Sequence, residues 1–254
     1  MGEVIETLHI TAKPEAVLSF LCLKIKSLNR SVRKAALESL IRYPELQPQT
    51  IKLMIVKDVL DRTVNHCRGI FLHLLEDEYY EIRILTLQCL RTFSLYLDRS
   101  ELKEIMFYMV NDNNESVRIE ALRALIAVAH DYLITGDDLS TMLMCLKDRR
   151  VQFRYYVYRL AGIVTIVNQE DFLNFVERLI RTLKVFKEDK VHLYIALRNL
   201  GSRSKRFVLG NVRQLLDIVD LEDLHEPNWK SILYKARVIL VASCFESNYY
   251  EGIR

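Results

Sequence analysis

Two stretches of the chain repeat each other: residues 75–90 read Leu75-Glu-Asp-Glu-Tyr-Tyr-Glu-Ile-Arg83-Ile-Leu-Thr-Leu-Gln-Cys-Leu90, and residues 110–125 read Val110-Asn-Asp-Asn-Asn-Glu-Ser-Val-Arg118-Ile-Glu-Ala-Leu-Arg-Ala-Leu125. In both, an aspartate is followed six residues later by an arginine with a branched apolar residue before it, and an apolar helical run comes next. A third copy has Phe153 before its arginine. The three pairs are Asp77 and Arg83, Asp112 and Arg118, and Asp148 and Arg154. Their recurrence after about 35 residues predicts an array of helical repeats.

A weaker copy lies upstream, where Val32-Arg33 is followed by another small and apolar helical run. The interval from Arg33 to Arg83 is longer than the others, so we expect extra helices there, one beginning at Thr50 and one at Asp61. The sequence predicts a single HEAT-repeat array over residues 1–254. Its clearest repeats are expected over 62–164, and divergent helical pairs over 165–246.

The Asp and Arg residues have a physical reason to recur. One repeat is too short to bury its own apolar faces, and stacked repeats bury them continuously. An arginine offers five donors in a rigid fork, so it can connect the turn of its own repeat to the next one. We therefore predict that the three pairs stabilise repeat stacking. The helix after Ser116 has two apolar stripes, one beginning at Val117 and one at Ile119, which predicts burial on two sides.

Composition supports an all-α fold, an α-solenoid of HEAT-like antiparallel helix pairs. Half of the 254 residues are apolar, and only 7 Gly and 4 Pro are present, which suits helices joined by short turns. The net charge of +3 argues against a dedicated nucleic-acid binder, so nucleic-acid contact is expected to be indirect at most.

The sequence shows no pattern typical of an enzyme. The glycines are scattered, with no phosphate-binding loop and no Gly-x-Ser-x-Gly motif. His66, Cys67 and His73 lack further metal ligands at a suitable spacing. We therefore expect no catalytic residues, no metal and no cofactor. Cys22, Cys89 and Cys145 lie in apolar helical runs and are expected to be reduced, buried thiols of an intracellular protein.

One polar feature stands out, the segment Gly201-Ser-Arg-Ser-Lys-Arg206. Together with Arg198 it places Arg203, Lys205 and Arg206 near one turn, as candidate contacts for a partner or for an anion such as phosphate. The alternative is a solvated basic surface. Gly201 itself is expected to end the preceding helix. A second cluster, Tyr155, Tyr156 and Tyr158, is interpreted as bulky repeat packing rather than as a recognition patch.

These motifs resemble known proteins. The Asp-x5-Arg units resemble HEAT repeats in general, and their particular sequences resemble those of the Integrator complex subunit 4 family. The strings that carry this resemblance are Leu75–Arg83, similar to that family's Leu-Glu-Asp-Glu-x-Tyr-Glu-Val-Arg, Asn111–Arg118, and Leu200-Gly-Ser-Arg203. It covers roughly residues 55–245. The family's chains are much longer, so this chain is a fragment or a shortened homologue.

The resemblance implies a nuclear scaffold without catalytic activity. In that family, the scaffold holds the RNA endonuclease module formed with subunits 9 and 11, which processes small nuclear RNA 3' ends and cleaves nascent transcripts. The implied partners are these proteins, with no membrane, and the chain would be a monomer within a larger complex. Two alternatives stay open: a HEAT-repeat adaptor of another assembly, in transport or phosphatase regulation, and a HEAT-fold DNA glycosylase.

Overall fold

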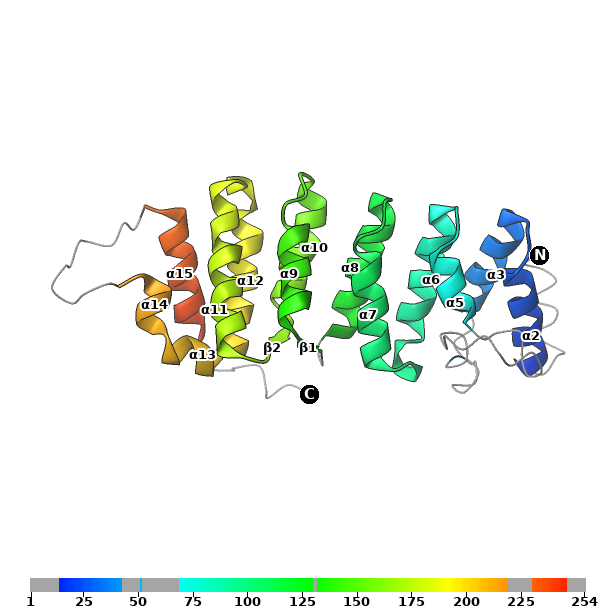
Figure 1. Cartoon of the computed structure of the whole chain (residues 1–254), viewed down its shortest axis with the longest axis horizontal. Coiled ribbons are helices and arrows are strands. Elements are labelled where there is room, and N and C mark those ends of the chain that lie inside the picture. The colour runs from blue at the N-terminus through cyan, green and yellow to red at the C-terminus, as the bar shows by residue number, and fades with distance from the viewer. Residues whose placement is uncertain (1–13, 43–50, 52–68, 130–131, 219–229, 246–254) are drawn as a thin grey trace. The chain divides into compact units, whose positions relative to one another are not determined.

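The computed structural model describes residues 14–42, 51, 69–129, 132–218 and 230–245, and these are almost entirely helical (Figure 1). They form HEAT-like helix pairs, so the predicted all-α fold class is confirmed. The chain divides into two compact units, unit 1 over Met1–Val128 and unit 2 over Ala129–Arg254. The single HEAT-repeat array over residues 1–254 stays a prediction.

Unit 1 is built from helix pairs whose two members pack against each other. Its elements are α2 (Pro14–Ile25), α3 (Arg30–Arg42), α5 (Ile70–Leu75), α6 (Tyr80–Thr92), the 3-10 turn η1 (Ser94–Tyr96), α7 (Arg99–Met109) and α8 (Glu115–Val128). The pairs are α2 with α3, α5 with α6, and α7 with α8, and contact from one pair to the next runs through α3, α6 and α8. The second helix of each pair therefore carries the repeat-to-repeat packing.

Helix α8 shows how the sequence pattern produces this packing. Both apolar stripes are buried, the first through Val117, Ala121 and Leu125 and the second through Ile119 and Leu122. The small alanines let α8 lie close to both α6 and α7. The prediction of burial on two sides is confirmed.

Side chains of the turns cap these helices. Asn114 accepts hydrogen bonds from the backbone N–H groups of Ser116 and Val117, at 2.9 and 3.4 Å, at the start of α8. At α7 the cap is Asp98, which accepts from the N–H groups of Ser100 and Glu101. A Ser100 side-chain hydrogen bond is the main reason that the pKa of Asp98 lies below its usual range, and the Glu101 N–H adds to it.

Unit 2 continues the pairing and adds two short strands. Its elements are β1 (Leu133–Ile134), α9 (Gly136–Cys145), α10 (Val151–Ala161), β2 (Thr165–Ile166), α11 (Gln169–Arg181), η3 (Thr182–Lys184), η4 (Lys187–Asp189), α12 (Lys190–Arg203), α13 (Lys205–Gly210), α14 (Val212–Leu216) and α15 (Ile232–Ser243). The strands pair in parallel, with Leu133 opposite Thr165 and Ile134 opposite Ile166. Sequence analysis did not predict them, since two residues are too few to give an alternating pattern.

The prediction that Gly201 ends a helix is wrong. Helix α12 continues to Arg203, and Gly201 is a buried residue at its contact with α15. A Cβ atom at this position would overlap the Ser243 hydroxyl and the backbone carbonyl of Leu240. Gly201 is required here for close helix packing, not for a left-handed turn.

Other expectations are partly corrected. The sequence alone predicts one further helix over about residues 207–219. The described part of this segment is instead divided at Asn211 into α13 and α14, and Asn211 Nδ2 donates to the Phe207 carbonyl at 2.8 Å. Cys89 and Cys145 are buried thiols, as expected, but Cys22 is disulfide-bonded. The extra helices expected from Thr50 and Asp61 lie largely outside the described residues, as do His66 and Cys67.

Candidate functional site

The arginine of one repeat connects two turns. Arg83 Nη1 donates to the backbone carbonyl of Asp77 in its own turn, at 2.7 Å. Its other two nitrogens bind the carboxylate of Asp112 in the next repeat, Nε to Oδ2 and Nη2 to Oδ1, each at 2.9 Å. Both side chains are about nine-tenths buried. A two-pronged, charge-assisted contact of this kind fixes orientation as well as distance.

Arg33 makes a similar contact one repeat earlier, with a single hydrogen bond to the aspartate. It donates to the Ser27 carbonyl at 3.0 Å and to Asp77 Oδ1 at 3.0 Å. Asp77 also accepts from the backbone N–H of Tyr79, so the carboxylate orders its own turn while it binds the preceding arginine. Arg118 repeats the first half of the pattern, donating 3.1 Å to the Asp112 carbonyl.

In unit 2 the corresponding contact is fully buried. Arg154 is 0% exposed and Asp189 is 1% exposed. Arg154 donates to both Asp189 oxygens, with Nη2–Oδ1 at 2.9 Å, to the Asp148 carbonyl at 2.9 Å and to Glu188 at 3.0 Å. Burial opposes the charge of Arg154, but the hydrogen bonds and charge of Asp189 outweigh it, and the pKa of the guanidinium is raised. We call the Arg33–Asp77, Arg83–Asp112 and Arg154–Asp189 contacts the Arg–Asp ladder.

Two aromatic side chains contact the Arg154–Asp189 pair, Phe186 through its ring and Tyr158 through its hydroxyl. The guanidinium lies 3.6 Å from the centre of the Phe186 ring, and the Tyr158 hydroxyl donates 3.2 Å to Asp189. Burial raises the pKa of Tyr158, so the hydroxyl keeps its proton and stays a donor. Tyr158 thus packs inside the repeat, as predicted, and Tyr155 lies against Tyr156 and His192 with ring centres 5.2 and 4.9 Å away.

From the sequence alone, Lys187-Glu-Asp-Lys190 is predicted to be a charged turn, and Asp189 is not recognised as a partner of Arg154. The aspartate-to-arginine motif is incomplete there, because position 195 is Ile rather than Arg. The interval from the arginine to its acceptor is not constant either, since Asp189 lies 35 residues after Arg154 and Asp112 lies 29 residues after Arg83.

The four basic residues singled out near Gly201 do not form one cluster. Arg203 and Arg206 line a cavity of about 480 Å³, together with residues 165–169, Ser204 and Phe207, and Arg203 donates to the Thr165 hydroxyl at 3.3 Å. Lys205 and Arg198 are not among its lining residues. Lys205 lies near the Cys244 thiol. Burial raises the pKa of this thiol, and the positive charge of Lys205 offsets part of the increase. The pairing of β1 with β2 holds Thr165 at the cavity, which the sequence did not indicate.

Within the described ranges, no three His, Cys, Asp or Glu side chains are grouped so that they could hold a metal ion. Among the helices described, none has the length and apolar character needed to cross a membrane.

No family model matches the chain. It is 27% identical over 175 residues to Integrator complex subunit 4 of Xenopus laevis and of Homo sapiens, which covers 68% of this chain, and 26% identical over 180 residues to that of Drosophila melanogaster. The chain resembles Integrator complex subunit 4. It spans 18% of the length of these relatives.

Solved structures with a similar fold are designed repeat proteins. A designed armadillo repeat protein in complex with the peptide (KR)4 matches 89% of this chain and 99% of its own, with a TM-score of 0.54 and 14% identity. An engineered protein matches 89% of this chain and 95% of its own, with a TM-score of 0.51 and 15% identity. At these identities the likeness shows the fold alone, a stack of helical repeats.

Proposed function

We propose that the chain is a non-catalytic scaffold subunit that binds the RNA endonuclease module of Integrator, subunits 9 and 11. In this role it serves small nuclear RNA 3'-end processing and nascent transcript cleavage in the nucleus, as a monomer within the larger complex. The observation that carries the proposal is the similarity to Integrator complex subunit 4 over about 70% of the chain.

The Arg–Asp ladder supplies the physical basis of a scaffold. A scaffold has to hold its outer surface in one geometry while partners bind and leave. The Arg83–Asp112 and Arg154–Asp189 contacts each join two consecutive repeats through a buried, two-pronged ion pair. Such a pair fixes the orientation of the two repeats, whereas a purely apolar interface would let them slide. We propose that Asp77, Arg83, Asp112, Arg118, Asp148 and Arg154 act in repeat stacking in this way, together with Asp189.

We further propose that the cavity beside Arg203 and Arg206 contacts an anionic group of a partner. Both side chains are exposed and both line the same space, whereas Arg198 and Lys205 lie outside it. A carboxylate or phosphate would find two guanidinium forks there.

Co-expression tests the endonuclease proposal directly. The tagged chain is expressed with subunits 9 and 11 and purified, and the eluate is resolved by size-exclusion chromatography with light scattering. A designed armadillo repeat protein carrying the same tag serves as the matched control for the fold. A complex formed with this chain and not with the control supports the proposal. Elution of the folded chain alone contradicts it and favours an adaptor of another assembly, and base excision from alkylated DNA would instead favour the glycosylase.

A further inference from the structure

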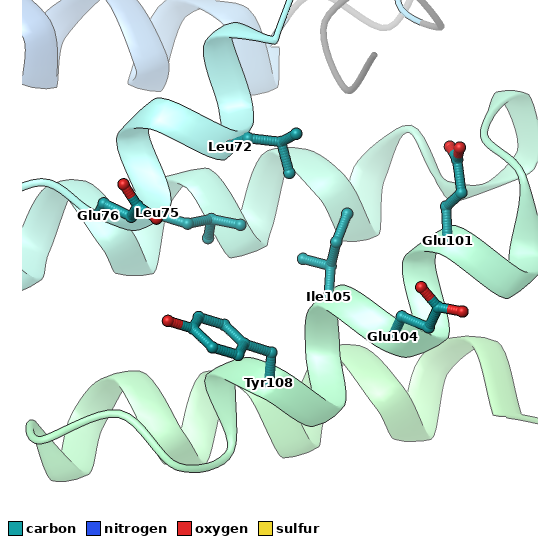
Figure 2. A pocket seen from close by; sticks show the side chains of 7 residues that line it. All are labelled: Leu72, Leu75, Glu76, Glu101, Glu104, Ile105 and Tyr108. Carbon is teal, nitrogen blue, oxygen red and sulfur yellow. The ribbon is translucent and has the colours of Figure 1, made fainter. Parts of the chain in front are cut away.

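An apolar groove in unit 1 lies between α5 and α7. Its floor consists of Leu72 and Leu75 from α5, and Ile105 and Tyr108 from α7, which point toward one another across the gap (Figure 2). It encloses about 430 Å³. The groove exists because the two repeats pack through α6 and α8, on the other side of the helix pairs. Tyr108 is 71% exposed, an unusual state for a large aromatic side chain that faces apolar neighbours.

Three carboxylates surround this floor, those of Glu76, Glu101 and Glu104 (Figure 2). All three residues are exposed, and none of the carboxylates hydrogen-bonds or pairs with a described residue. Glu101 and Glu104 lie three residues apart and so share one face of α7. The groove therefore combines apolar contact area with uncompensated negative charge at its rim.

The groove continues into a second cavity of about 360 Å³ with a more polar lining. The two share Leu75, Glu76 and Tyr108, and the second one adds Met109, the Arg83–Asp112 ion pair, and Asn111 and Asn113 from the α7–α8 turn. Together they give a surface longer than a single side chain requires. Amide side chains such as that of Asn111 both donate and accept hydrogen bonds, which suits a peptide backbone.

The corresponding groove of unit 2, between α9 and α11, has the opposite charge. Its lining has apolar residues similar to those of the first groove, including Leu143 and Val185, but its charged residues are Lys147, Arg178 and Arg181. The two described grooves therefore differ in charge, and an acidic rim is not a general property of the repeat.

We propose that the groove between α5 and α7 binds a basic amphipathic peptide segment of a partner protein. Leucine-type side chains of the segment occupy the floor beside Tyr108, and its lysines or arginines pair with Glu76, Glu101 and Glu104. Apolar contact supplies the affinity, and complementary charge selects the sequence and accelerates association. The proposal rests on the composition of the groove and is independent of the Integrator assignment.

Fluorescence anisotropy with labelled peptides tests this on the full chain. The probe is a short peptide that alternates leucine with arginine and lysine, and the control peptide replaces each basic residue by glutamate. Glu101→Lys with Glu104→Lys reverses two rim charges. Glu78→Lys with Glu170→Lys makes the same change in net charge at exposed positions outside the groove. Tyr108→Ala removes the exposed ring, and circular dichroism checks that every variant is folded.

We expect the basic peptide to bind the chain, with affinity reduced about tenfold by the groove double variant and reduced by Tyr108→Ala. The control double variant should change affinity much less, and the acidic peptide should not bind. Equal loss in both double variants would mean that only net charge attracts the peptide, and that result overturns the proposal. So would binding that Tyr108→Ala leaves unchanged, or no binding of the basic peptide at all.

Discussion

The Arg154–Asp189 contact offers the sharpest test of the ladder. In Asp189→Asn the side chain keeps its shape and one oxygen acceptor but loses its charge. Arg154, which is 0% exposed, then lacks its main counter-ion. The guanidinium cannot lose its proton to relieve this, because its pKa lies far above neutral pH and is raised further in this site.

The expected magnitude follows from burial. Removing one partner of a buried ion pair costs about 3–5 kcal/mol, and the oxygen retained by asparagine places this variant at the lower end, about 3 kcal/mol. Glu188 provides the matched control, since its side chain is 56% exposed while it binds the same guanidinium at 3.0 Å. Exposed pairs contribute about 0–1 kcal/mol, so Glu188→Gln should have a small effect.

Native-state hydrogen exchange measures the two variants locally. Peptides from α10 and α12 report opening of this repeat boundary, and about 3 kcal/mol corresponds to roughly a hundredfold faster exchange there. A third variant, Arg154→Met with Asp189→Leu, replaces the pair by apolar side chains and should recover most of the loss, because no charge is left buried. Similar exchange in Asp189→Asn and Glu188→Gln would refute the reasoning.

Three further predictions concern other contacts. Gly201→Ala should lower the free energy of unfolding in urea by about 1–3 kcal/mol, because the added Cβ overlaps Ser243 and Leu240 at the α12–α15 contact. Gly210→Ala, with open space around it, should be neutral or stabilising. Equal losses of unfolding free energy in the two variants would contradict this. Arg203→Glu with Arg206→Glu should weaken binding of polyphosphate or of an anionic partner without unfolding the chain. Arg213→Glu, which lies outside the cavity, should leave this binding unchanged. If the double variant binds as tightly as the original chain, the cavity is excluded as a site. The pKa of Asp98 is lowered in the folded chain, so its cap stabilises α7 above the usual carboxylate range and is lost as the pH falls through that lowered value. Exchange of the first α7 turn should therefore rise only in acid, and Asp98→Ala should remove this pH dependence.

The sequence predicted the parts of the fold that depend on local repetition. The recurring Asp and Arg, together with the two stripes of α8, indicated the helix pairs and the helix buried on two sides. Helix boundaries were predicted less accurately. From the sequence, Ser100 is expected to cap a helix over Glu101–Val110, whereas α7 begins at Arg99. Asp98 caps α7 although Ser100 is also a good cap residue, because the aspartate reaches both N–H groups from the position before the helix.

The features that the sequence did not predict depend on contacts between distant residues. Asp189 belongs to the ladder through Arg154, 35 residues earlier, and nothing in its neighbourhood marks it. Gly201 is needed because α15 approaches α12, which no local pattern reveals. The division of the basic turn into cavity residues and outside residues likewise follows from the β1–β2 pairing.

Affinity purification from nuclear extract tests whether the chain is a scaffold of the Integrator endonuclease module. The tagged chain and its Asp189→Asn variant are each recovered, and bound proteins are quantified by mass spectrometry. We expect subunits 9 and 11 to be enriched with the chain and reduced with the variant, whose repeat boundary is loosened. Recovery of the folded chain without subunits 9 and 11 would contradict the proposed role.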